Sequence, residues 1–290
     1  MGPFLEALAA SVDHAARREA DPVRFAHRYE TREDREVAAV IAACFAYGRV
    51  AGFTPVLERI FDLADDRGGP RAWVDGFDVE RDAAALAPLV YRWNRGVDVS
   101  LLALGLRDLL AGGRSLEEHL PAPVEARADL AEALDAFIGA LRGAATRAAP
   151  ALDLGATSFE QLPRGFRTFL PRPGDGSATK RWWMFLRWMV RPVTEGVDLG
   201  LWTRARPSEL LVPVDTHVLR LSRFLGLTSR RDGSLRTARE ITAALRRIDP
   251  LDPVRFDFAL AHLGISGACR GRRDDEVCPA CPLHGACIAR

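Results

Sequence analysis

Apolar residues recur at intervals of three and four along most of the chain, which is the spacing of one face of an α-helix. In residues 31–45, Val37, Ile41 and Phe45 share a face, and Thr31 stands where an N-cap belongs. The same spacing predicts helices over residues 4–19, 21–29, 53–65, 99–110, 123–145, 178–190, 216–225, 235–248 and 253–263. Alternating strand patterns are scarce, so the pattern predicts an all-α fold.

The bulk composition places the chain among soluble globular proteins. Its 290 residues are 48% hydrophobic and 27% charged. No apolar run reaches the roughly 20 residues that a membrane span needs, because Arg187 interrupts the best candidate at 182–190. The start of the chain lacks a basic segment followed by an apolar one, so it does not read as a signal peptide. We therefore expect a cytoplasmic protein whose cysteines stay reduced.

The charge is distributed unevenly along the chain, although its net value is only +1. Residues 1–159 carry more acidic than basic groups, whereas residues 160–290 carry 22 basic and 14 acidic groups. Such an asymmetry is typical of a surface that binds a polyanion. It is equally compatible with solvated helix faces in an arginine-rich protein.

Lysine is almost absent from this sequence. Of the 40 basic residues, Lys180 is the one lysine. Arginine can replace lysine wherever only a positive charge is needed, but a guanidinium does not give up its proton in proteins. Lys180 is therefore either a chance survivor or a residue whose amine is needed.

Four of the five cysteines lie within 19 residues near the end of the chain: Cys269, Cys278, Cys281 and Cys287. Four thiols this close in a reducing compartment are typical of a metal site. The single C-x2-C with uneven flanking gaps favours a [4Fe–4S] cluster, and zinc is the alternative. Either metal would be structural, because four thiolates leave no open position. Cys44 falls on an apolar helix face, where a core residue is expected.

Two short motifs carry candidate chemistry. Residues 171–180 read P-R-P-G-D-G-S-A-T-K, in which Gly174 and Gly176 form a turn before a helix, so backbone N–H groups there could hold a phosphate. Asp215 follows in V-D-T-H at the start of the next predicted helix. It is either an N-cap or a carboxylate that stabilises a cationic transition state.

The hairpin with its lysine, the V-D-T-H segment and the cysteine motif together resemble the helix–hairpin–helix DNA glycosylases of the endonuclease III type. The last three cysteines keep that family's spacing. The chain is more similar still to an uncharacterised bacterial family of this superfamily, which carries G-S-x-x-K-R, F-L-R-W-M-V and P-x-D-T-H. Three departures are an Asp175 in a hairpin with two extra residues, a longer Lys180–Asp215 interval with an insertion near 191–213, and a first cysteine gap of eight residues.

The resemblance implies roles for particular residues. Lys180 matches the amine that attacks C1′ of the damaged nucleotide, and Asp215 matches the carboxylate that assists cleavage of the glycosidic bond. Tyr47 falls where the family inserts a side chain into the gap left by a flipped base. The full set of residues expected to contact DNA is Gly174, Gly176, Ser177, Arg181, Tyr47 and Arg49.

The resemblance also implies a two-lobed fold. Residues 31–190, with the hairpin at 171–180, would form a helical barrel, and residues 1–30 with 191–290 would form a second lobe closed by the cysteine loop at 269–287. We expect His217 to be a packed core residue. We also expect Trp182 and Trp183 to belong to the core rather than to stack on a flipped base.

The expected function is that of a bifunctional DNA glycosylase and abasic-site lyase of base-excision repair. Its expected partner is double-stranded DNA with a modified or damaged base, bound by a monomer associated with the nucleoid. Two alternatives stay open: a non-catalytic protein that recognises DNA or RNA structure on the same fold, and a monofunctional glycosylase in which Lys180 only contacts phosphate.

Overall fold

The computed structural model of the chain describes residues 1–121 and 129–289. This part is predominantly helical, as the sequence predicts. Its one named sheet is a two-stranded antiparallel hairpin in which β1 (Val90–Tyr91) pairs with β2 (Asn94–Arg95). None of the helices described is both long and apolar enough to cross a bilayer.

Contacts within the chain divide it into two compact units. We call residues 18–175 the central unit, and residues 1–17 together with 176–290 the terminal unit. The helix over residues 180–190 therefore belongs with both ends of the chain. The division into folding domains at residues 30 and 190 stays a prediction.

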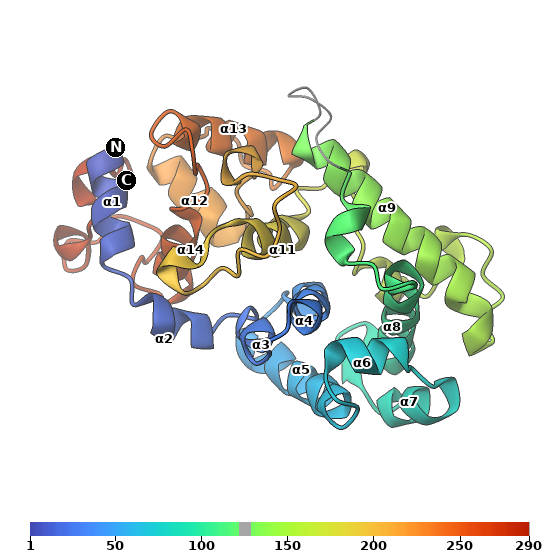
Figure 1. Ribbon diagram of the computed structural model, residues 1–290. Coiled ribbons are helices and arrows are strands. Elements are labelled where there is room, and N and C mark those ends of the chain that lie inside the picture. Colours follow the sequence, from blue (N-terminus) through green and yellow to red (C-terminus); the bar gives the residue numbers. More distant parts are fainter. Residues whose placement is uncertain (122–128, 290) are drawn as a thin grey trace. The chain divides into compact units, whose positions relative to one another are not determined.

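The central unit contains eight of the described α-helices and the β-hairpin. Figure 1 labels the helices from α3 to α9. These helices are α3 (Arg24–His27), α4 (Arg32–Phe45), α5 (Val50–Asp65), α6 (Pro70–Asp75), α7 (Val79–Leu86), α8 (Gly96–Leu110), α9 (Leu130–Ala148) and α10 (Arg164–Arg167). Short 3-10 helices connect them: η1 (Leu116–His119), η2 (Ala149–Leu152), η3 (Phe159–Gln161) and η4 (Pro173–Asp175). Helix α8 packs along α9, and this close approach needs Gly105, because a Cβ there would lie 3.2 Å from the Ala145 side chain.

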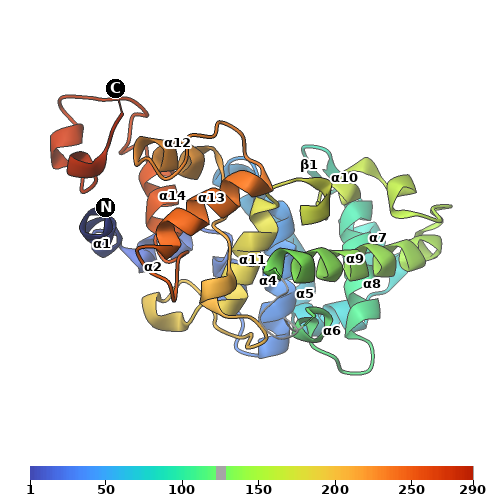
Figure 2. The ribbon, with the colours of Figure 1, turned by 90° about the horizontal axis from the view of Figure 1, so that it is seen from above.

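The terminal unit combines α1 (Gly2–Ala10) with helices from the second half of the chain, and α2 (His14–Glu19) continues into the central unit. The later helices are α11 (Lys180–Val190), α12 (Thr216–Phe224), α13 (Leu235–Arg246) and α14 (Asp257–Ile265). The 3-10 helices of this unit are η5 (Val193–Glu195), η6 (Pro207–Glu209), η7 (Cys278–Ala280) and η8 (His284–Ala286). Helix α12 packs against α14, and the loop with the cysteines lies beyond them, next to α1 (Figure 2). Its Gly285 leaves room for the Phe4 ring of α1.

The observed helices depart from the expected ones in a few places. The segment 4–19 is two helices, because the Asp13 carboxylate accepts a hydrogen bond from Ala16 N at 3.0 Å and starts the second one. Helices α6 and α7 were not expected, and Asp78 caps the second of them. The helix expected over 123–145 is observed as α9, and residues 122–128 lie outside the described part of the chain.

A network of ion pairs is buried in the terminal unit. Arg187 of α11 contacts Asp198 and Asp257 at 3.1 Å each, and Arg191 contacts Asp198 at 2.5 Å and Asp252 at 2.9 Å. Arg187, Arg191, Asp198 and Asp257 are each at most 4% exposed. Burial raises the pKa of Asp257 to about 6, although the two arginines oppose the shift. The network fixes the far end of α11 to the start of α14.

Candidate functional site

Lys180 is the first residue of α11, and the backbone just before it is in an unusual conformation. Thr179, the N-cap residue, has φ 44°, in the left-handed region that β-branched residues rarely adopt. Its side chain is 3% exposed, and its hydroxyl has no hydrogen-bond partner among the described residues. Strain of this kind persists where the surrounding structure imposes it, and it gathers at functional sites. The sequence carries no signal for it.

Asp215 is the N-cap of α12. Its Oδ1 accepts hydrogen bonds from His217 N at 2.9 Å and Val218 N at 2.8 Å. These two bonds satisfy backbone donors that a helix start leaves without partners. The capping interpretation of this residue is therefore confirmed.

The second carboxylate oxygen of Asp215 faces the lysine. Lys180 Nζ lies 3.3 Å from Asp215 Oδ2, and the two side chains are 34% and 16% exposed. One oxygen thus caps the helix while the other contacts the amine. The two interpretations of Asp215 are compatible, because capping holds the carboxylate in place without using the oxygen that would take part in chemistry.

The start of α12 packs closely against α14. A Cβ at Gly264 of α14 would lie 2.6 Å from the His217 Cβ, so this glycine lets His217 pack closely. His217 is packed against α14 but only half-buried, so the expectation that it belongs to the core is wrong. His262 of α14 is 6% exposed, and burial, helped by nearby cations that include Lys180, lowers its pKa to about 4. His262 is therefore neutral at physiological pH.

The hairpin before Lys180 is not open on all sides to a phosphate. The Gly174 N–H donates to Asp135 Oδ1 at 2.8 Å, and Arg172 forms an ion pair with the same carboxylate. The Arg172 hydrogen bond, together with the Gly174 N–H, holds the pKa of Asp135 below its usual range. A carboxylate of the protein therefore already uses the Gly174 amide.

The remaining residues expected to contact DNA lie on both units. Gly176, with φ 78°, Ser177 and Arg181 are in the terminal unit, close to Lys180 along the chain. Tyr47 and the exposed Arg49 are in the central unit, between α4 and α5. There the Tyr47 hydroxyl donates to the Asn94 side chain, and its ring stacks on Trp93, which no motif of the sequence points to.

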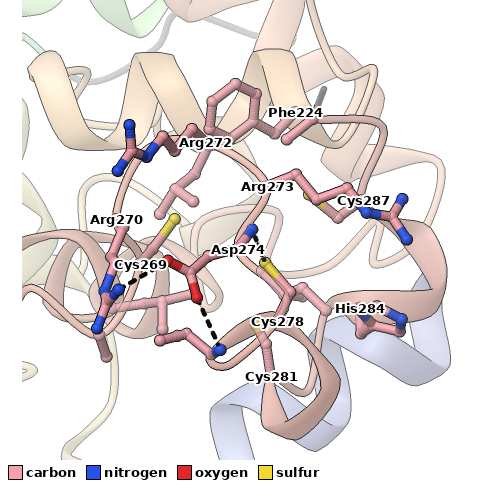
Figure 3. A pocket seen from close by; sticks show the side chains of 16 residues that line it. Phe224, Cys269, Arg270, Arg272, Arg273, Asp274, Cys278, Cys281, His284 and Cys287 are labelled. Carbon is pink, nitrogen blue, oxygen red and sulfur yellow. Dashed lines mark hydrogen bonds and ion pairs between the residues drawn. The ribbon is translucent and has the colours of Figure 1, made fainter.

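The four clustered cysteines line one cavity in the terminal unit (Figure 3). Its volume is about 70 Å³, and all four thiols are partly buried. Asp274 lies between the side chains of Cys269 and Cys278, and its backbone N–H contacts Cys278 Sγ at 3.3 Å. In residues 1–121 and 129–289 as they stand, no three His, Cys, Asp or Glu side chains are arranged to coordinate a metal ion.

The chemistry of this cavity nevertheless fits a thiolate-bound metal. All four thiols line the same cavity, and burial together with the thiols at 269, 278 and 287 raises the pKa of Cys281, a shift that a bound cation would reverse. An N–H group directed at a cysteine sulfur is one of the contacts that tune iron–sulfur clusters. Cys44, at 1% exposure, is a core residue, as expected.

Trp182 and Trp183 directly follow the lysine but do not reach the surface. They are 1% and 0% exposed, and Trp182 packs edge-on against Phe185, with ring centroids 5.6 Å apart. The expectation that they belong to the core is confirmed. They anchor the first turn of α11 in the hydrophobic interior, and this fixes the backbone of the partly exposed Lys180.

Comparison with known proteins gives a family without an assigned activity. No curated protein and no solved structure matches the chain. A family described as a protein of unknown function (DUF2400) matches residues 21–266, which include Lys180 and Asp215 and stop short of the clustered cysteines. Because this match spans well over half of the sequence, the chain belongs to the DUF2400 family.

Proposed function

We propose that the protein is a bifunctional DNA glycosylase and abasic-site lyase with a two-lobed helix–hairpin–helix glycosylase fold. The observation that carries this proposal is the 3.3 Å contact between Lys180 Nζ and Asp215 Oδ2. Lys180 is the one lysine of the chain, it is accessible, and its partner is a carboxylate fixed by a helix cap. An amine beside a proton acceptor is what nucleophilic attack on a sugar carbon requires.

The proposed reaction begins once the modified base has left the DNA stack. The neutral amine of Lys180 bonds to C1′ while the bond from C1′ to the base breaks, and the base departs with that electron pair and gains a proton. Asp215 accepts the proton that the amine loses, and its negative charge stabilises the cationic sugar as it forms. Opening of the sugar ring gives an imine between Lys180 and C1′.

The lyase step follows from that imine. Loss of a proton from C2′ and cleavage of the C3′–O3′ bond release the downstream strand with a 5′ phosphate, and hydrolysis of the imine leaves an unsaturated aldehyde on the upstream strand and returns the free amine. Asp215 suits the proton transfers because its Oδ1 is fixed by the backbone of α12, which leaves Oδ2 directed at the amine. Gly176, Ser177 and Arg181 would contact the phosphates next to the site.

The cysteines at 269, 278, 281 and 287 would hold a [4Fe–4S] cluster, with zinc as the alternative. With four thiolate ligands the metal would close the C-terminal loop rather than react with substrate. Metal analysis of the purified protein tests the assignment. Four irons with inorganic sulfide support the cluster, whereas one zinc per chain without iron assigns zinc.

Borohydride trapping on a duplex with one abasic site tests the catalytic proposal. Reduction of the imine should give a covalent protein–DNA adduct whose attachment site maps to Lys180. Lys180→Arg keeps the charge but has no attacking amine, so the adduct should be lost. Arg206→Ala, at a side chain that is 74% exposed, is the matched surface control and should trap like the wild type.

Other outcomes identify the alternatives. Equal trapping by Lys180→Arg, or an adduct that maps to the N-terminal amine, would show that Lys180 is not the nucleophile. Release of a base from a duplex carrying a single lesion, with no adduct and with full activity in Lys180→Arg, would indicate a monofunctional glycosylase. DNA or RNA binding without turnover that is indifferent to Asp215→Asn would indicate a non-catalytic binding protein.

A further inference from the structure

The β-hairpin of the central unit presents a tryptophan to solvent. The chain has six tryptophans, and Trp93, between β1 and β2, is 47% exposed. The other five are at most 3% exposed: Trp73, Trp182, Trp183, Trp188 and Trp202. Trp93 is thus the one indole that the fold leaves open to a ligand.

The exposed indole is held firmly in place. Its ring lies almost parallel to the Tyr47 ring, with centroids 5.4 Å apart and planes at 10°. Its Nε1 donates to Thr168 Oγ1 at 2.9 Å, and the Tyr47 hydroxyl donates to the buried Asn94 side chain. Among the residues that the structure describes, no second ring or guanidinium stacks on Trp93. An oriented ring with an open surface is a preformed stacking site.

The hairpin and the chain stretches next to it are basic, whereas the later part of α5 carries Glu58, Asp62 and Asp65. Strand β1 contacts α5, and β2 contacts α10. The stretches 46–57, 90–95 and 163–172 contain six arginines and no acidic residue. Five of these arginines are exposed: Arg49, Arg92, Arg95, Arg164 and Arg167. The Arg92 guanidinium also lies 5.8 Å from the centre of the Tyr47 ring.

We propose that Trp93, Tyr47 and these five arginines form a stacking platform for an unpaired nucleobase of a single-stranded nucleic acid. The base would stack on Trp93, and the arginines would contact the flanking phosphates. Every base has a flat π face, so such a platform binds without reading sequence. The absence of acidic residues from these stretches favours an anionic ligand over a protein surface of mixed charge. The proposal does not depend on the chemistry of Lys180.

Iodide quenching of tryptophan fluorescence tests the platform directly. Because iodide reaches exposed indoles, the quenching should come almost wholly from Trp93 and should vanish in Trp93→Phe. A 12-nucleotide oligothymidylate should protect Trp93 from iodide. A strand of the same length built of abasic deoxyribose phosphates has the same charge without bases and should protect far less. An oligouridylate arm shows whether RNA is bound as well as DNA.

Fluorescence anisotropy with a labelled oligothymidylate gives the affinity. Trp93→Ala should weaken binding about tenfold, since it removes the aromatic ring on which the base stacks. Trp93→Phe should retain most of the affinity. The control is Leu251→Ala, at an exposed apolar residue of the terminal unit, which should bind like the wild type. Thermal unfolding of each variant verifies that it is folded.

Three results would overturn the platform: no protection by oligothymidylate, equal protection by the abasic strand, or wild-type affinity in Trp93→Ala. Lys180→Arg should bind the oligonucleotide like the wild type. If Lys180→Arg also traps an abasic site normally, the catalytic proposal fails while the platform stands. The two proposals therefore fail separately.

Discussion

The two ends of helix α11 carry two different kinds of ion pair. At its start, Lys180 contacts one carboxylate, and its side chain is 34% exposed. At its other end, Arg187 in the last turn and Arg191 at the C-cap contact several carboxylates, with side chains that are 4% and 3% exposed. The same helix thus holds an accessible amine at one end and a buried network at the other.

The difference matches what each side chain can do. A guanidinium is planar, keeps its charge when buried and can bond to several carboxylates at once, which the network uses. An ammonium bonds less specifically but can lose its proton and attack carbon. In a chain with 39 arginines and one lysine, arginine serves the buried structural positions, and the lysine stands where an amine is accessible. We therefore expect substitution of the buried arginines to lower stability and spare the chemistry, and substitution of Lys180 to abolish the chemistry and spare stability.

The largest effect on stability is expected in the buried network. Arg187→Met leaves Asp257 buried with its closest cation removed, and it weakens the pairing of Asp198. Breaking a buried pair by removing one partner costs about 3–5 kcal/mol. Urea unfolding should show a loss of this size. Arg206→Met, which removes an exposed pair with Glu209, should change the free energy of unfolding by less than about 1 kcal/mol. Similar losses of stability in Arg187→Met and Arg206→Met would show that the buried network contributes no more than an exposed ion pair.

The next largest effect is a pH dependence of the free energy of unfolding that comes from His262 of α14. His262 has a pKa of about 4, below the usual 6.5, so the unfolded chain binds more protons than the folded one between these values. Its contribution to stability is present above about pH 6.5 and is lost as the pH falls to about 4. The free energy of unfolding of the wild type should therefore fall relative to that of His262→Phe by up to about 3 kcal/mol across this range.

Urea titrations of both proteins at several pH values measure that difference. Asp257 acts in the opposite direction, because its pKa is raised to about 6 and stability is lost as the pH rises through that value. Since Asp257 is present in both proteins, its effect cancels in the comparison. A pH-independent difference between wild type and variant would show that His262 does not titrate as proposed.

The helices and their caps were the most predictable part of the structure. The Thr31 and Asp215 side chains cap α4 and α12 because their hydrogen bonds are local and depend on a few neighbouring residues. The interruption at Asp13 was missed because the apolar spacing continues across it, and only the cap shows where the first helix ends. Short helices such as α6 offer too few apolar positions for a period to be read.

The contacts of the candidate site were only partly predictable. The sequence singled out Lys180 and Asp215, but their 3.3 Å contact depends on how α11 and α12 pack. The bond between Gly174 and Asp135 joins residues that are 39 positions apart, so no local pattern announces it. The stacking of Trp93 on Tyr47 likewise joins distant segments. The left-handed conformation of Thr179 is set by tertiary packing, against the preference of a β-branched residue.

A smaller effect on stability is expected at Asp215, where two variants distinguish the capping role of Oδ1 from the chemical role of Oδ2. Asp215→Ala removes the cap of α12 and should cost about 1 kcal/mol in urea unfolding. Asp215→Asn keeps an oxygen that can accept from His217 N and Val218 N, so its stability should stay within about 0.5 kcal/mol of the wild type. Both variants should lose base release and trapping, because neither has a carboxylate beside Lys180. Full activity in Asp215→Asn would limit Asp215 to a capping role.

The smallest effect on stability is expected at Lys180, the partner of Asp215 in the 3.3 Å contact. Lys180→Met keeps the aliphatic stem of the side chain and removes a partly exposed pair, and such pairs contribute about 0–1 kcal/mol. The urea midpoint should therefore hardly move, while borohydride trapping disappears. The comparison with Arg187→Met is then complete, since that variant should lose several kcal/mol and yet trap normally under conditions where it is folded. If Lys180→Met instead destabilises the protein as much as Arg187→Met, the lysine has a structural role, and its scarcity in the sequence carries no chemical meaning.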